Sequence, residues 1–513
     1  MKTRPRKIFF ASIGTLLVLG ILIALNIVLS SSPLRLDLTS NKVYTFSAIT
    51  KDALSGLDDP IIIKAYITDN VPDEKKEDKK YLENLLKEFK VYGKGKVQLE
   101  FINPNESTEK ETEAQQAGIT PLQFNKIEND SVSIQRGYLG VSIQYGDKKE
   151  LIPYITSTNG LEYDLTSRIR KVTNKNLPVV GIIQGYGAPE LSGYTQGAYT
   201  MQMLTQELNK SYKVLPVDLA SANEIDPSIG TLIIGGIKEA VPAEKIALIK
   251  KFSDNGGNIL VSQSSVGIDI SQGITAKEIP LETLNSFLSS EGITISKNLL
   301  ADRSAKQIGV STQNGTLIMQ QLVSFPLLPL IKDITPHLIT EKLTAVTLPF
   351  ASPLTITNNT GITTLLYSSK NSSEYTNINV INPIEPDSFF NQESASGSKF
   401  PIALIKESQK NNKTASLIVV GSSGCIIDQL LQASQDTTCL KLILNAVDTT
   451  LQDARLIEVR NKGFETRLLR ETTSEEKLLF KTIALGLPSF LTILGGLLYL
   501  RFRYSRMKKN YLK

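Results

Sequence analysis

Residues 179–190 read VVGIIQGYGAPE, a short apolar run that ends in a glycine-rich turn. An apolar run of this length, bounded by turn residues, is typical of a strand that is buried on both faces of a parallel sheet. The elements predicted next are helices at 199–208 and 242–252 and strands at 212–217, 230–234 and 258–262. Strands and helices that alternate in this order predict a doubly wound α/β domain.

This domain is predicted to span residues 178–470, and it resembles the layered folds of flavodoxin and the class I amidotransferases. Between 269 and 415 its pattern weakens into stretches rich in Ser, Thr and Asn. Two apolar runs broken by proline lie there, FPLLPL at 325–330 and LPFASPL at 348–354. Each run is either a buried loop or an exposed docking patch, and we expect burial. The pattern resumes with a strand at 416–421 and a helix at 439–447.

The preceding part of the chain, residues 33–173, predicts a second and smaller domain. Its expected elements are strands at 61–68, 96–102, 132–135 and 138–145 and helices at 79–92, 107–117 and 161–171. We expect the last two strands to be joined tightly at Arg136 and Gly137. The order β-α-β-α-β-β-α resembles a thioredoxin-like fold. Because no cysteine occurs in this part, a dithiol mechanism is excluded, and a recognition or spacer role is favoured.

The residues needed for enzymatic chemistry are not assembled in this sequence. An amidotransferase requires a cysteine at a sharp turn after a central strand, but the turn after 258–262 offers Gln263, Ser264 and Ser265. The single histidine is His337. A hydrolase that pairs Ser264 with His337 is the alternative, although the Gly-x-Ser-x-Gly pattern is absent around these serines. We therefore predict that the protein is not an enzyme and has no catalytic residue.

Cofactor and metal sites are not predicted either. The turn Gly185–Pro189 lacks both the Gly-x-Gly-x-x-Gly spacing and the Lys-Ser/Thr of a P-loop, so we expect a structural turn. One histidine and the two cysteines, Cys425 and Cys439, do not supply a zinc site. A disulfide between these cysteines is permitted if they lie outside the cytoplasm, but the sequence leaves the pairing open.

Two uncharged apolar segments, at 8–29 and 482–500, predict one transmembrane helix near each end. The tails at 1–7 and 501–513 are basic, and the positive-inside rule therefore predicts that both are cytoplasmic. The domains between the helices would then lie outside the cytoplasm, at the cell membrane. The alternatives are a cleaved signal peptide for the first segment and a buried core helix for the second.

The charge distribution favours a membrane partner over nucleic acid. The chain has 56 Lys and Arg residues against 51 Asp and Glu residues, but ten of the basic residues lie in the two tails. The part between the tails is therefore mildly acidic, and no nucleic-acid partner is predicted. Basic residues beside a membrane helix favour anionic lipid headgroups.

The segment RLDLTSNKVYTFS at 35–47 resembles the opening of the gliding-motility-associated ABC transporter auxiliary family, the GldG-like proteins. Further similar segments lie at 60–68, 337–340, 347–354, 418–423 and 442–447. The resemblance implies a non-catalytic auxiliary subunit of an ABC-2-type transporter, whose permease and ATPase are separate chains. It brings no catalytic residue.

The turn at 422–425 departs from the family, in which an acidic residue more often follows the glycine, so no ligand role is implied for it. We therefore expect a membrane-anchored subunit that binds or positions cargo or partner proteins. Two alternatives stay open: a membrane-anchored hydrolase of amidotransferase-like fold, and a cell-surface scaffold or sensor without a transporter.

Overall fold

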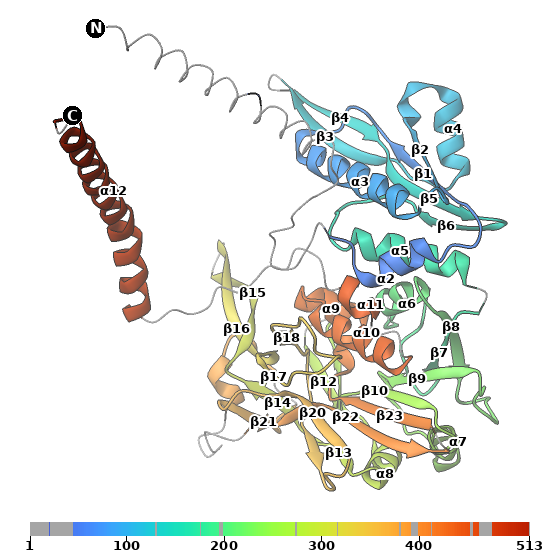
Figure 1. The fold of residues 1–513 in the computed structure, drawn as a ribbon. Coiled ribbons are helices and arrows are strands. Elements are labelled where there is room, and N and C mark those ends of the chain that lie inside the picture. The colour runs from blue at the N-terminus through green and yellow to red at the C-terminus, as the bar shows by residue number, and fades with distance from the viewer. Residues whose placement is uncertain are drawn as a thin grey trace. The chain divides into compact units, whose positions relative to one another are not determined.

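The computed structural model describes residues 20, 45–128, 131–174, 176–193, 198–271, 274–314, 317–378, 381–390, 399–411, 413–451, 455–460 and 474–511. The chain divides into two units, Met1–Phe464 and Glu465–Lys513. The predicted tail at 1–7 and the predicted membrane helix at 8–29 lie outside the described residues, apart from Gly20. The first unit is a mixed α/β structure with an eight-stranded and a four-stranded sheet (Figure 1).

The eight-stranded sheet has the strand order β17-β20-β22-β23-β10-β9-β7-β8. Its parallel part consists of β7 (Val179–Gln184), β8 (Lys213–Asp218), β9 (Ile229–Gly235), β10 (Asn258–Ser262) and β23 (Lys413–Val420). Its antiparallel part consists of β22 (Pro401–Lys410), β20 (Ile362–Tyr367) and β17 (Asp333–Ile334). The prediction of a parallel sheet is confirmed for the first part and wrong for the second. The reason is that the chain reaches β23 through a tight hairpin from β22 instead of through a helical crossover.

Helices cover both faces of the parallel part. They are α6 (Gln202–Asn209) and α10 (Thr438–Thr450) on one face and α7 (Ala243–Asp254) and α8 (Glu282–Ser290) on the other. Ile233 and Leu260 belong to the core that contains α6 and α10, whereas Leu232 and Ile259 belong to the core that contains α7 and α8. Because successive strand residues point to opposite faces, the apolar runs seen in the sequence bury both faces.

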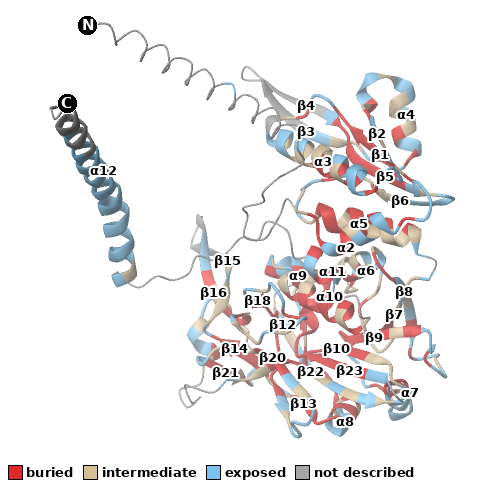
Figure 2. Cartoon of the chain, in the orientation of Figure 1, coloured by how far each residue is buried: buried red, intermediate tan, exposed pale blue. Residues whose placement is uncertain are grey.

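The stretch in which the sequence pattern weakens contains further strands, both short and long. They are β11 (Val266–Asp269), β12 (Thr275–Glu278), β13 (Ile293–Ile295), β14 (Leu299–Asp302), β15 (Ala305–Asn314), β16 (Leu317–Ile331), β18 (Val346–Thr347), β19 (Leu354–Ile356) and β21 (Ser372–Tyr375). Both apolar runs are buried here: Phe325 and Leu327 in β16, and Leu348 and Ala351 after β18 (Figure 2). Burial is therefore confirmed, and the docking-patch reading is wrong.

The four-stranded sheet lies in the N-terminal part of the first unit and has the order β2-β1-β5-β6. The strands of this sheet are β1 (Ile61–Ile67), β2 (Val97–Ile102), β5 (Leu139–Tyr145) and β6 (Lys148–Ile152). The helices of this part are α3 (Asp73–Tyr92), α4 (Thr108–Gln116) and α5 (Leu161–Thr173). β1 and β2 are parallel, whereas β5 is antiparallel to β1 and to β6. Ser107 caps α4, as its position before an acidic first turn predicts, by accepting a hydrogen bond from the Lys110 backbone N–H.

One predicted connection in this part is wrong. The strand expected at 132–135 does not pair with the strand that follows it. It is β4 (Ser131–Gly137), and it pairs with β3 (Leu122–Glu128) in a separate hairpin. β5 instead pairs with β6 across the turn at Gly146 and Asp147. The sequence signal at Arg136 and Gly137 marks the end of a strand and not a hairpin turn.

The second unit contains α12 (Ser474–Tyr511), which includes the predicted membrane segment 482–500 and most of the basic tail. Within it, Glu475–Arg501 is long and apolar enough to cross a membrane, with a mean hydropathy of 1.9 and 0% of its apolar window buried.

Candidate functional site

Open α/β sheets bind ligands beyond the carboxyl ends of their parallel strands. The first such position here is the turn Gly185–Pro189 after β7. The carbonyl oxygen of Tyr186 accepts hydrogen bonds from the backbone N–H groups of Lys238 and Glu239, at 3.0 and 3.1 Å. Gly236 has a φ of 65°, and a Cβ atom there would lie 2.5 Å from Cδ of Pro189. The two turns after β7 and β9 therefore pack directly on each other.

The second position is the N-terminus of α6, where backbone N–H groups would attract an anion. The carboxylate of Asp428 occupies it. Its oxygens accept hydrogen bonds from the backbone N–H groups of Gln202 (2.7 Å) and Met203 (3.0 Å) and from the hydroxyl of Thr200 (2.7 Å). Asp428 begins α9 (Asp428–Ser434), more than two hundred residues away in the sequence. A negative charge of the chain itself thus fills the site that a phosphate would take.

The third position lies beyond β10 and β23, and the segment 349–352 fills it. Ser264 donates a hydrogen bond to the carbonyl oxygen of Phe350 at 2.9 Å and accepts one from the backbone N–H of Ser423 at 3.0 Å. Ser422 donates to the carbonyl oxygen of Pro349 at 2.5 Å. These serines are buried. Their hydroxyls therefore hold the 349–352 segment in place and do not face a substrate cavity.

The structure does not bring together the two residues of the hydrolase hypothesis. His337 lines an open pocket of about 590 Å³ that does not include Ser264. Its Nδ1 accepts a hydrogen bond from the backbone N–H of Ile339 at 3.1 Å, and the backbone N–H of His337 donates to the hydroxyl oxygen of Thr340 at 3.0 Å. Burial lowers the pKa of His337. This histidine shapes its own loop, and Ser264 is engaged elsewhere.

No group of three or more His, Cys, Asp or Glu side chains suited to a metal ion occurs within the described ranges. Pockets of about 670 and 370 Å³ lie elsewhere in the first unit, the former around Gly230, Asn258 and Lys413. That pocket surrounds the amino ends of β9 and β10, opposite to the edge at which such sheets bind ligands.

A different constellation joins the N-terminal and C-terminal parts of the first unit. Helix α5 carries Glu162, which is buried beneath α2 (Ala48–Ser55). Oε1 of Glu162 accepts hydrogen bonds of 2.8 Å from the backbone N–H and hydroxyl of Ser47 and from the hydroxyl of Thr50. These contacts fasten the start of α2, where the described part of the folded unit begins, to α5.

The next residue of α5, Tyr163, fastens the other end of the folded unit. Its hydroxyl accepts a hydrogen bond of 3.0 Å from Nη2 of Arg460, the last residue of α11 (Arg455–Arg460). Nη1 of Arg460 lies 2.6 Å from Oδ2 of Asp448 in α10, and both side chains are almost fully buried. Tyr212 donates a hydrogen bond of 2.7 Å to the same carboxylate. Burial opposes the charge of Arg460, but Asp448 and Tyr163 outweigh it and raise its pKa, so Arg460 stays charged.

We call Ser47, Glu162, Tyr163, Asp448 and Arg460 the α5 junction. A further ion pair supports it, between Lys210 after α6 and Asp164 of α5 at 2.6 Å. Burial alone would lower the pKa of Lys210, but Asp164 and Glu207 outweigh it and raise that pKa. The sequence predicts the helix that contains Glu162–Asp164, but no local pattern indicates partners at 47 and 460. The junction was therefore not predictable as a site.

Two family models match different parts of this chain. Residues 40–144 match a family described as a domain of unknown function (DUF7088). An uncharacterized protein of Borreliella burgdorferi is 24% identical over 497 residues, which cover 93% of this chain and 94% of that protein.

Two solved structures are also similar, at TM-scores too low to carry a conclusion. The mmIFT52 N-terminal domain has a TM-score of 0.34 and 18% identity, over 53% of this chain and 97% of that one. A putative ThuA-like protein from Parabacteroides merdae has a TM-score of 0.27 and 11% identity, over 58% and 94%.

The part of the chain that forms the eight-stranded sheet carries the clearest relationship. Residues 177–446, which run from just before β7 into α10, match the model of a family of auxiliary proteins described as an ABC-type uncharacterized transport system. This match spans more than half of the sequence, and the chain belongs to that family of ABC-type transport system proteins.

Proposed function

We propose that this protein is a non-catalytic, membrane-anchored auxiliary subunit of an ABC-2-type transporter. Its partners would be a separate permease and a separate ATPase, and its folded part would bind or position cargo or partner proteins outside the cytoplasm. The observation that carries this proposal is the family match over 177–446, joined in one chain to an apolar helix long enough to span a membrane. Within the family we favour the GldG-like branch, on the segment at 35–47.

The filled ligand positions support a binding role over catalysis. Gly236 packs against the turn after β7, Asp428 caps α6, and the 349–352 segment covers the ends of β10 and β23. Each of these contacts comes from the chain itself. A flavodoxin- or amidotransferase-like scaffold with these positions closed retains its outer surfaces for contact with other proteins.

The four-stranded sheet supports the thioredoxin-like interpretation of residues 33–173. A parallel β1-α3-β2 unit followed by antiparallel β5 and β6 and then by α5 is the order expected of that fold. Without cysteines it would serve in recognition, beside the larger domain 178–470.

The α5 junction supports anchoring by both ends. The chain enters the described fold near Ser47 and leaves it near Arg460, and consecutive residues of α5 hold these two points. In the sequence, the predicted helix at 8–29 precedes the first point and α12 follows the second. Both flanking segments would thus start from one place on the folded unit, as two helices in one bilayer with cytoplasmic tails require.

Capture of the intact complex tests the proposed partners. Membranes that contain a tagged full-length chain are crosslinked, gently solubilised and purified, and the co-purified proteins are identified by mass spectrometry. We expect an ABC ATPase and a multi-span permease. The matched control carries Leu491→Lys and Leu494→Lys, which place two charges in the apolar span and should reduce the capture, although the predicted helix at 8–29 would still hold the chain in the membrane.

Two results would contradict the proposal. Repeated capture of neither protein, from a preparation in which another membrane complex is shown to be intact, would favour the scaffold or sensor alternative. Equal capture by the control variant would show that α12 does not anchor the subunit.

A further inference from the structure

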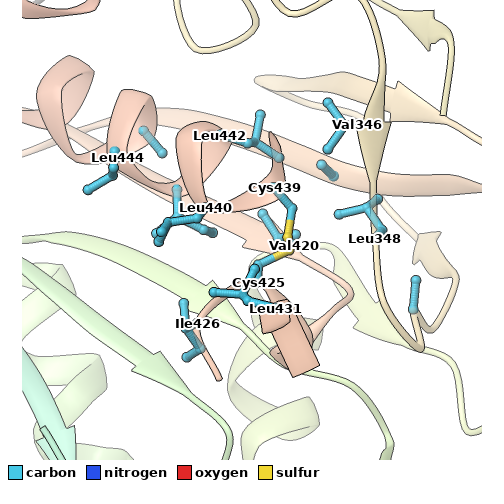
Figure 3. Close-up of a cluster of buried hydrophobic side chains, with 14 of the residues drawn as sticks. Val346, Leu348, Val420, Cys425, Ile426, Leu431, Cys439, Leu440, Leu442 and Leu444 are labelled. Carbon is cyan, nitrogen blue, oxygen red and sulfur yellow. The ribbon is translucent and has the colours of Figure 1, made fainter. Parts of the chain in front are cut away.

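The two cysteines of the chain come together in the core of the first unit. Cys425 ends the short helix η3 (Ser423–Cys425) that follows β23, and Cys439 lies in the first turn of α10. Helix α10 packs against η3. Figure 3 shows the two sulfur atoms facing each other among apolar side chains that include Val420, Leu431 and Leu440. Both residues are 0% exposed and are free thiols in this structure.

The environment of this pair excludes the other common roles of cysteine. Burial, together with the neighbouring Cys425 thiol, raises the pKa of Cys439 well above its ordinary value. A buried thiol that stays protonated is neither a good nucleophile nor a metal ligand. No His, Asp or Glu completes a metal site with them among the described residues. What the geometry does allow is a bond between the two sulfur atoms.

We propose that Cys425 and Cys439 form a disulfide that closes the loop carrying α9. The reaction is an exchange with an oxidant of the disulfide class, such as oxidised glutathione. One thiolate attacks the oxidant and releases one thiol, and the second cysteine then displaces the other. The two cysteines lose two electrons and two protons, and the oxidant becomes two thiols. Because both sulfurs are buried in the folded unit, the exchange takes place before α10 packs against η3.

The bond would stabilise a loop that other contacts depend on. α9 lies between the two cysteines, and its first residue, Asp428, caps the N-terminus of α6, which packs into the same core as α9. A crosslink from Cys425 to Cys439 closes the segment that contains Asp428 into a loop. This loop lowers the conformational entropy of the unfolded chain. The pairing rests on the fold alone, whereas the supply of an oxidant in the cell rests on the proposed extracytoplasmic position.

Counting free thiols in the full-length protein tests the pairing. The detergent-solubilised chain is partly unfolded under reducing conditions and returned to native buffer with oxidised and reduced glutathione. It is then alkylated in denaturant and weighed by mass spectrometry. We expect no alkyl group and no bound glutathione, and two alkyl groups after reduction. The single variants Cys425→Ala and Cys439→Ala should each retain one reactive thiol. Two alkylated cysteines, or glutathione on both, would overturn the pairing.

Two further measurements test separately whether the disulfide stabilises the protein and whether it forms in the cell. The oxidised protein should unfold at a Tm higher than that of the reduced protein by on the order of 5 °C, and equal Tm values would overturn the stabilising role. Protein taken from cells with the alkylating reagent already present reports on the compartment. If the protein from cells has free thiols, whereas the protein refolded in glutathione buffer has the disulfide, the extracytoplasmic position is contradicted. The pairing itself is then still supported.

Discussion

Tyr163 accepts a hydrogen bond from Arg460 at 3.0 Å, across 297 residues of sequence, and so joins α5 to α11. Arg460 also forms an almost fully buried ion pair with Asp448. The charged side chain of Arg460 is therefore one of the contacts that couple the N-terminal part of the first unit to α10 and α11.

Removing this charge should destabilise the folded unit strongly. Arg460→Met leaves Asp448 as a buried, uncompensated carboxylate, which typically costs about 3–5 kcal/mol. Denaturant unfolding of the solubilised chain measures the loss. The matched control is Arg455→Met, which removes an ion pair with Asp52 whose two side chains are 62% and 61% exposed. An exposed pair contributes little, so equal effects of the two substitutions would contradict the role given to the α5 junction.

Asp428 should cap the N-terminus of α6 from outside that helix. Asp428→Ala removes the acceptor of two backbone N–H groups, and we expect a loss of about 1–2 kcal/mol in the free energy of unfolding. Asp428→Asn keeps a capping oxygen of the same reach and should lose less. Both variants are compared by thermal unfolding. A larger loss for asparagine than for alanine would show that capping is not what this residue does.

The 349–352 segment packs so closely on Gly421 that a larger residue at this position should displace it. A Cβ atom at Gly421 would lie 2.1 Å from the carbonyl oxygen of Ser352, so Gly421→Ala should displace the segment and cost about 1–3 kcal/mol. Gly309→Ala is the control, because no atom lies within 4 Å of its Cβ position. We expect the control to unfold at nearly the wild-type Tm. Unchanged stability of both variants would mean that the segment does not close the end of the sheet tightly.

Much of the parallel half of the fold was predictable from sequence, because its signals are local. The apolar runs at β7, β9 and β10 each lie within a few residues and bury both faces. β22 was missed although it is equally regular, because its alternation continues into exposed polar residues and lies within a stretch rich in Ser and Thr.

The site contacts were not predictable, for a physical reason. The partners of Asp428 are more than two hundred residues away, and those of Glu162 lie more than one hundred residues before it. No local spacing encodes such pairs, because they depend on how strands and helices pack. For Cys425 and Cys439 the sequence left the pairing open, because their separation along the chain does not show whether the fold brings them together.

Stability should fall in acid through Glu291, which ends α8. Burial raises the pKa of this carboxyl, but ion pairs with Lys406 (2.7 Å) and Lys410 (2.9 Å) outweigh it and lower the pKa. The unfolded carboxyl, with a pKa of about 4.3, therefore binds a proton before the folded one does. The contribution is complete above about pH 5 and is lost as the pH falls through the folded pKa. Glu291→Gln should flatten the fall in Tm between about pH 5 and pH 3. Glu244→Gln, at an exposed position of α7, is the control. An equal fall in Tm between about pH 5 and pH 3 in both variants would contradict the role given to Glu291.

The central claim is that this chain is a transporter subunit held in the membrane beside a permease, and photo-crosslinking from within α12 tests it most directly. A photoreactive residue is placed at Leu491, one turn before Gly495, where small side chains allow close helix packing, and a second at Glu476 near the start of the helix. After irradiation of native membranes, the account predicts a crosslink from position 491 to a multi-span permease. Crosslinks from position 491 to lipid alone, with the protein intact and inserted, would contradict it.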